Sequence, residues 1–229
     1  MTISQKISEF MESSSWIRKM FEEGIKLKKL YGEENVFDLS LGNPVIEPPR
    51  ELKEALIAAA KDPAPGRHRY MPNAGFPDVR EAVARSISPE AGVALSADDV
   101  IMVCGAAAGI NITLKTLLNP GDEVIVFVPY FVEYFFYADN HGGRIVTVPT
   151  KKDFTLDIKS LRDAFTARTK AVIVNSPNNP TGVVYSRQSL AEVAKVLRAS
   201  KEPFWWYSNR LPWKEFSPER EMVSTLAEP

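Results

Sequence analysis

Residues 171–182 read AVIVNSPNNPTG, and this stretch decides the fold class. Its first four residues are apolar and three of them are β-branched, which is typical of a strand covered on both faces. The Asn- and Pro-rich residues that follow predict a turn. Ser186 can then cap a helix whose apolar residues, from Leu190 to Leu197, fall on one stripe. Strand, turn and helix in this order predict half of a βαβ unit, although an ordinary connection without a ligand has the same pattern.

The composition excludes several classes of function. The chain has 229 residues, of which 45% are hydrophobic, so it can bury a sizeable core. A formal charge of -1 gives no attraction to nucleic acid or to an anionic membrane. Cys104 is the only cysteine, which excludes an intrachain disulfide and favours a reducing compartment. Since no signal-peptide core or membrane-spanning run is found, we expect a cytoplasmic protein with neither nucleic-acid nor membrane partners.

A second apolar run, residues 100–104, predicts another buried strand, and the small residues 105–109 follow it before a helix. Small residues at such a turn let backbone N–H groups point at a phosphate, whose charge the helix dipole favours. The pattern matches neither the dinucleotide fingerprint nor the phosphate-binding loop of nucleotide hydrolases. Tight packing of the helix on the sheet explains Ala108 and Gly109 better than it explains Gly105.

Asn179-Pro180-Thr181-Gly182 resembles the N-P-[TS]-G signature of the class I/II aminotransferases, the fold-type I enzymes that use pyridoxal 5'-phosphate (PLP). Four further motifs, spread from Leu39 onward, follow the family's order, and the closest likeness is to its aspartate aminotransferase-like members. The resemblance implies an α/β fold with a doubly wound, mainly parallel sheet, incomplete at its C-terminus. It implies an N-terminal helical arm or part of the small domain over residues 1–35. A partial PLP-binding large domain would occupy residues 36–200, and residues 201–229 would form an anomalous tail.

The resemblance also assigns the cofactor contacts. Gly105, Ala106 and Ala107 would hold the phosphate of PLP, and Phe131 would stack on its pyridine ring. Asn179 would donate its side-chain amide to the phenolic oxygen and lie near the substrate. Pro180 can follow a cis peptide bond, which X–Pro sequences permit at low cost.

Two further residues complete the implied site. Residues 70–80, YMPNAGFPDVR, are similar to the family's Y-x-x-x-x-G-x-x-x-L-R, with Val79 where Leu is usual. Tyr70 would reach the cofactor phosphate of the other subunit in a homodimer. Gly42 would let the backbone approach the substrate's α-carboxylate. No metal site is predicted, and His68 and His141 receive no catalytic role.

The resemblance ends near Ser200. The family's aspartate that pairs with the pyridine nitrogen, its Schiff-base lysine and its substrate-binding arginine are not recognised in the tail, residues 201–229, and neither is a further buried strand. A truncated or frame-shifted reading of a longer gene is favoured over a short protein with a divergent end. We therefore expect this chain to have no aminotransferase activity and to be poorly soluble alone.

Three other functions share parts of this sequence pattern. Another PLP reaction on the same scaffold, such as a lyase or decarboxylase reaction, has the same signature, because PLP is the electron sink in all of them. A non-catalytic dimerisation or ligand-binding module would keep the fold without the lysine. A generic nucleotide-binding domain is least favoured, because no acidic ribose ligand stands at the expected distance from a glycine fingerprint. The leading reading is transfer of an amino group from an amino acid to a 2-oxo acid.

Overall fold

The computed structural model describes residues 2–13, 15–37, 39, 46–66, 69–200 and 205–207. The chain divides into two compact units, residues 1–68 and 69–229, which are described separately. This division falls at a different place from the boundary at residue 36 that the sequence suggested. The assignment of a helical arm, a large domain and a tail stays a prediction.

The secondary-structure elements described in the first unit are all helices. It contains α1 (Gln5–Ser13), α2 (Ser15–Tyr31), the short 3-10 helix η1 (Glu33–Asn35) and α3 (Arg50–Lys61). Pro49 directly precedes α3. Proline is tolerated at the start of a helix, because the N–H that it lacks would have no partner within the helix there. None of the residues of α3, all of which are described, is buried.

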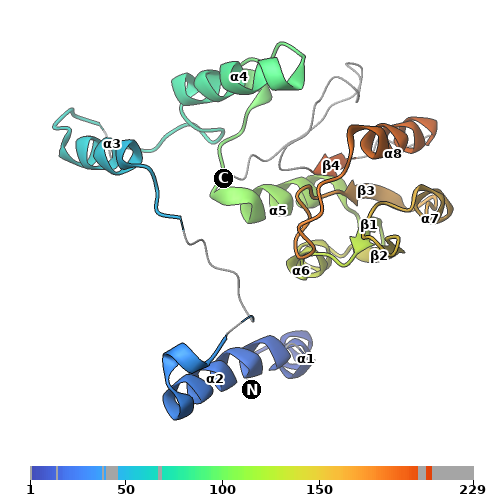
Figure 1. Cartoon of the computed structure of the whole chain (residues 1–229). Helices are drawn as coiled ribbons and strands as arrows, with labels where there is room; N and C mark the ends of the chain where they lie inside the picture. Colours follow the sequence, from blue (N-terminus) through green and yellow to red (C-terminus); the bar gives the residue numbers. More distant parts are fainter. Residues whose placement is uncertain are drawn as a thin grey trace. The chain divides into compact units, whose positions relative to one another are not determined.

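The second unit contains a parallel sheet between helices (Figure 1). Its strands lie in the order β2-β1-β3-β4, and each neighbouring pair is parallel, which confirms the predicted α/β class. In chain order its elements are α4 (Pro77–Ala91), η2 (Ala97–Asp99), α5 (Gly105–Leu117), β1 (Glu123–Val128), α6 (Glu133–Asp139), β2 (Arg144–Pro149), α7 (Ile158–Asp163), β3 (Thr169–Ile173), α8 (Arg187–Ala199) and β4 (Trp205–Tyr207).

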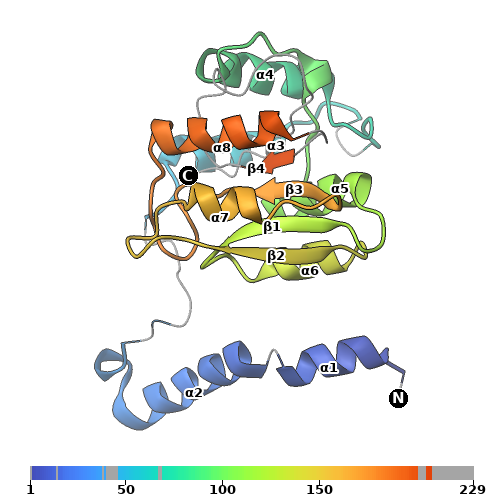
Figure 2. The same ribbon diagram turned by 90° about the vertical axis from the view of Figure 1, so that its right-hand side faces the viewer.

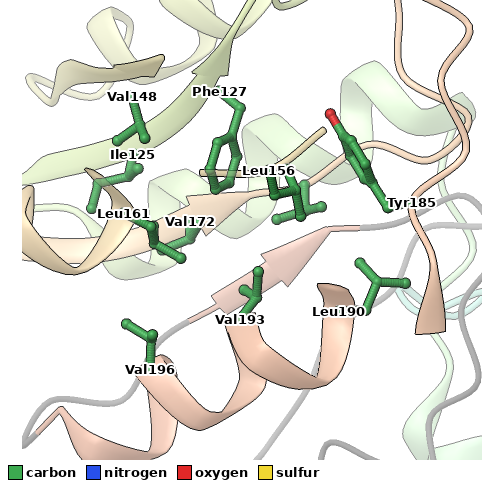
Figure 3. Close-up of a cluster of buried hydrophobic side chains, with 11 residues drawn as sticks. Ile125, Phe127, Val148, Leu156, Leu161, Val172, Tyr185, Leu190, Val193 and Val196 are labelled. Carbon is green, nitrogen blue, oxygen red and sulfur yellow. The ribbon is translucent and has the colours of Figure 1, made fainter. Parts of the chain in front are cut away.

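Alternation of side chains along the strands builds a core on each face of the sheet. On β1, Val124 and Val126 pack in one cluster with α5 and α6, whereas Ile125 and Phe127 pack in the other with α7 and α8. The two helix layers lie on opposite sides of β1 and β3 (Figure 1 and Figure 2). Figure 3 shows the second cluster, in which Val193 of α8 lies among the strand residues. Burial on both faces explains why these strands are continuous apolar runs in the sequence.

Two helix caps lie beside this core, and the one at Ser186 confirms the prediction from the sequence. The Ser186 hydroxyl accepts a hydrogen bond from the backbone N–H of Ser189 at 3.1 Å, at the start of α8. The Asp157 carboxylate accepts one from the N–H of Ser160 at 3.0 Å, at the start of α7. Each cap satisfies a donor that the first helical turn leaves unpaired.

The strand predicted over residues 100–104 is wrong. Residues 100–104 belong to no helix or strand, and α5 begins directly after them at Gly105. Ile101 is 62% exposed, although Val100 is buried. Instead of pairing with a strand, the N–H of Met102 donates to the carbonyl of Ala74 at 3.0 Å. An apolar run becomes a strand only where a neighbouring strand meets it, and the described sheet offers none here.

The tail contains a strand that the sequence analysis did not find. β4 pairs in parallel with β3, with Ala171 opposite Trp205 and Ile173 opposite Tyr207. Its three residues, Trp-Trp-Tyr, are all aromatic, a type favoured in strands, but the run is too short to predict a strand from sequence. The sheet therefore continues past α8, contrary to the expectation for residues 201–229.

Among the helices that the structure describes, none has the length and apolar character needed to cross a lipid bilayer.

Candidate cofactor-binding site

Two of the predicted site residues follow neighbouring parallel strands. β1 and β3 pair directly, so their carboxyl ends lie at the same edge of the sheet. Phe131 comes three residues after β1, and Asn179 comes six residues after β3. Ligands of open α/β sheets bind outside this edge.

The N-terminus of α5 lies at the same edge of the sheet, because α5 and β1 have nearly the same length and run in opposite directions. Residues 118–122 join the end of α5 to the start of β1, so the helix runs back along the strand. Thirteen residues of helix span about 20 Å at ~1.5 Å each, and six residues of strand span about 20 Å at ~3.3 Å each. Ile110 and Leu114 hold the helix on the sheet, so its first turn stands level with the end of β1.

The first turn of α5 has the features that an anion requires. Gly105 has φ +80°, which an L side chain rarely adopts, and a Cβ added there would meet nothing within 4 Å. The glycine is therefore needed for its backbone conformation and not for space. No side chain caps the helix at Cys104, so the backbone donors of the first turn are not used by a cap, unlike those of α7 and α8. Gly109, by contrast, is buried.

Three of the polar side chains after β3 are buried. Asn175, Ser176 and Asn178 are 5%, 2% and 7% exposed, whereas the neighbouring Asn179 is exposed. The Oδ1 of Asn178 accepts hydrogen bonds from the hydroxyl of Thr181 at 2.8 Å and from its backbone N–H at 3.3 Å. The two adjacent asparagines therefore have different roles: the Asn178 side chain accepts hydrogen bonds within the turn, and Asn179 is exposed.

The turn closes on its own backbone. The N–H of Gly182 donates to the carbonyl of Asn178 at 2.7 Å, and the N–H of Asn178 donates to the carbonyl of Val183 at 2.9 Å. The hydroxyl of Ser176 accepts the N–H of Tyr185 at 3.0 Å, which ties the turn to the core beneath it. The peptide bond before Pro180 is cis, as the sequence allowed.

Phe131 is held by a buried ring. It is 36% exposed, and its ring meets that of Tyr134 edge-on, with centroids 5.7 Å apart and an angle of 85° between the planes. Tyr134 is 5% exposed and belongs to the core beside α5 and α6. Edge-to-face pairs of this kind fix the orientation of a partly exposed ring.

Of the two remaining predicted site residues, Tyr70 and Gly42, the structure describes only Tyr70. Tyr70 is fully exposed in the segment before α4, so its role across a subunit interface stays a prediction. Gly42 and His68 lie outside the described residues. No group of three His, Cys, Asp or Glu that could hold a metal ion occurs in the part of the chain that the structure describes.

Sequence reasoning missed the supporting residues Asn175, Ser176 and Asn178. The signal that could have found them is their place directly after a buried strand, where a polar side chain is covered and must find a partner. The roles of Gly105, Ala106, Ala107, Phe131 and Asn179 in binding PLP stay predictions. The chemistry of these residues fits PLP. The uncapped N–H groups of α5 suit its phosphate, the Phe131 ring suits its pyridine ring, and the exposed Asn179 amide suits its phenolic oxygen.

Comparison with known proteins places the chain in a family. Residues 34–203 match the family "Aminotransferase class I and II". The chain is 39% identical over 175 residues to a probable aspartate/prephenate aminotransferase of Thermus aquaticus, a match that covers 76% of this chain and 44% of the relative. It is 32% identical over 212 residues to an aspartate aminotransferase of Thermotoga maritima, covering 91% of this chain and 54% of the relative.

Solved structures agree with this assignment. A crystal structure of an aminotransferase from Eubacterium rectale superposes with a TM-score of 0.83 at 32% identity, covering 91% of this chain and 54% of that one. The aspartate aminotransferase of Thermus thermophilus with maleate superposes with a TM-score of 0.75 at 30% identity, covering 91% and 56%. The chain therefore belongs to the class I and II aminotransferase family. It spans about half the length of the curated relatives that it matches.

Proposed function

We propose that this chain carries the cofactor-binding half of an aminotransferase and binds PLP at the carboxyl edge of its sheet. The observation that carries the proposal is the meeting of two features at that edge. The uncapped first turn of α5 offers backbone N–H groups for the phosphate, and Asn179 offers an exposed amide for the other end of the molecule. Family membership supports the choice of PLP over other phosphate compounds.

Each residue has a defined task in this proposal. The N–H groups of Ala106 and Ala107 donate to the phosphate, with the helix dipole adding a favourable charge. The ring of Phe131 stacks on the pyridine, which is worth about 0.5–1.5 kcal/mol beyond burial. Asn179 donates to the phenolic oxygen and fixes the tilt of the ring. When bound, the cofactor supplies an electron sink for bonds broken at the α-carbon of an amino acid.

The substrates and partners follow from the relatives. The Thermus and Thermotoga proteins are named for aspartate, so we propose an amino acid of this kind as donor and a 2-oxo acid as acceptor in the whole protein. A cytoplasmic homodimer, with Tyr70 reaching the partner's cofactor, belongs to the same proposal. The names of the relatives favour amino-group transfer over a lyase or decarboxylase reaction.

Equilibrium dialysis of the chain with PLP and with pyridoxal, which lacks the phosphate, tests this site. If α5 binds the phosphate, pyridoxal binds at least about tenfold more weakly, since a charge-assisted hydrogen bond contributes roughly 1.5–3 kcal/mol. Inorganic phosphate should compete with PLP. Equal binding of the two compounds would exclude a phosphate site.

A charge placed in the first turn of α5 gives a second test of the site, and an uncharged variant of the same size is its matched control. Ala107 is exposed there, and an acidic residue at a helix N-terminus interacts favourably with the dipole, so Ala107→Glu should fold. The new carboxylate should repel the phosphate and weaken PLP binding at least about tenfold. Ala107→Gln has the same size without the charge and should bind nearly as the unmodified chain does. Equal affinities for the two variants would contradict the proposal.

A further inference from the structure

We infer that Asn175 and Asn178 are positioning residues, which hold the backbone of Asn179 so that its side chain faces the cofactor without contributing to the turn. This inference rests on the proposed function of Asn179. Neither positioning residue is offered as a cofactor ligand, because both side chains are buried and used inside the turn.

The composition of the turn explains why it needs side-chain acceptors. Pro177 and Pro180 lack an N–H, so a regular ladder of backbone hydrogen bonds cannot run through residues 177–182. The remaining N–H groups of a partly buried turn still require acceptors. Asparagine suits this task, because its carbonyl oxygen is like that of the peptide group and has two lone pairs.

Every backbone N–H from Asn178 to Val183 has an acceptor in the structure. Two of these five N–H groups donate to backbone carbonyls, and three donate to side-chain oxygens. The pairs are Asn178 N–H to Val183 O at 2.9 Å, Asn179 N–H to Asn175 Oδ1 at 2.6 Å, Thr181 N–H to Asn178 Oδ1 at 3.3 Å, Gly182 N–H to Asn178 O at 2.7 Å and Val183 N–H to Thr181 Oγ1 at 3.3 Å.

Asn175 makes the contact that matters for Asn179. It lies two residues past the end of β3, and its side chain is 5% exposed. Its Oδ1 accepts the N–H of Asn179 at 2.6 Å, across four residues. The backbone of Asn179 is therefore tied to the end of a core strand, while its side chain remains exposed. A donor held in place before binding loses less conformational entropy when the ligand arrives.

Amide hydrogen exchange of the chain without cofactor, measured by NMR, tests the inference directly. Asn178→Ala removes the acceptor of Thr181 and should speed exchange of the Thr181 amide by about tenfold, the effect of losing one hydrogen bond. Asn178→Asp keeps an acceptor oxygen and should leave this amide protected. Asn175→Ala should speed exchange of the Asn179 amide by a similar factor, about tenfold. Unchanged exchange of these amides in the alanine variants would overturn the inference.

Two more variants separate positioning from ligand contact. Asn179→Ala should weaken PLP binding while its own backbone amide stays protected, because Asn175 still accepts that N–H. Asn178→Ala should weaken PLP binding and also release the turn. If the unmodified chain does not bind PLP, the proposed function fails, yet the exchange rates still decide whether the two asparagines hold Asn179.

A variant that fails to fold would leave no measurement, so a milder pair is included. Thr181→Val removes the hydroxyl that donates to Asn178 and accepts from Val183, with little change of shape. Thr181→Ser keeps the hydroxyl. Faster exchange of the Val183 amide in the valine variant, and not in the serine variant, supports the network; equal rates in both contradict it. Protection of the β1 amides confirms that each variant is folded.

Discussion

At the scale of single residues, Asp157 links the stability of the second unit to pH. Its carboxylate accepts hydrogen bonds from the backbone N–H and the hydroxyl of Ser160, and these bonds lower the pKa of Asp157 below its ordinary 3.8. A lowered pKa stabilises the fold above the unfolded pKa, and this contribution is lost as the pH falls through the folded pKa.

We therefore expect Asp157→Asn, which keeps an acceptor oxygen but cannot ionise, to reduce the acid sensitivity of the chain. Urea unfolding followed by circular dichroism would be compared from about pH 6 down to about pH 3.5. The stability difference between the original chain and the variant should narrow as the pH falls. A difference that stays constant over this range would exclude the linkage.

Residue identity alone could not separate Asn178 from Asn179. Both are polar, adjacent and next to a proline, and only the family resemblance favoured Asn179 as the ligand. The structure supplies the physical reason for a difference between them, because one side chain is 7% exposed and bonded within the turn and the other is exposed. The caps at Asp157 and Ser186 could be predicted, since capping depends on residues within one turn of the helix.

At the scale of elements, α4 is joined to the segment that leads into α5. The carbonyl of Ala74 accepts the N–H of Met102, and a guanidinium N–H of Arg80 donates to the carbonyl of Val100 at 3.5 Å. Gly75 lies between these contacts with φ +96°, and a Cβ added there would come within 2.7 Å of the Met102 Cγ. Contacts with α4 and with the turn before it therefore hold the segment that leads to the proposed phosphate site.

Gly75→Ala should consequently destabilise this junction more than a left-handed glycine elsewhere. Gly182→Ala is the matched control, because Gly182 has φ +71° and open space around its Cβ position. The control should lose about 1 kcal/mol for backbone conformation, and Gly75→Ala about 1–3 kcal/mol more for crowding. Urea unfolding measures both variants. Equal losses would show that Met102 moves aside without cost.

The core beneath α7 gives a second prediction at this scale. Leu161 is completely buried, whereas Leu56 on α3 is 63% exposed. Leu161→Ala should lower the free energy of unfolding by about 2–5 kcal/mol through lost burial and a cavity. Leu56→Ala should change it by roughly 0.5 kcal/mol or less. Similar effects of the two substitutions would mean that α7 is not packed as described.

The predictions of strands from the sequence were wrong where strand formation depends on residues that are distant in the sequence. Residues 100–104 and 171–174 are both short apolar runs, but only the second belongs to a strand, since β1 and β4 flank it. The aromatic β4 was missed because a run of three residues is too short to indicate a strand. Helices such as α8, which have an N-cap and a stripe of apolar residues, can be predicted because both features are local in the sequence.

At the scale of the whole molecule, the sheet has a hydrophobic core on each face, and the proposed cofactor contacts follow its strands. The Schiff-base lysine that the family resemblance implies is not recognised among the lysines of this sequence. Noncovalent binding through α5, Phe131 and Asn179 would remain. Cofactor affinity and catalysis should therefore be separable in this chain.

Borohydride treatment in the presence of PLP tests this separation, because it makes any lysine–cofactor link permanent. After dialysis, intact-mass and peptide analysis should show no single lysine labelled in preference to the others. The Thermotoga maritima relative, treated in the same way, provides the comparison. Turnover of aspartate with a 2-oxo acid should not exceed that of PLP alone. One lysine labelled stoichiometrically, together with turnover above that background, would place the reacting group within these residues and refute the separation.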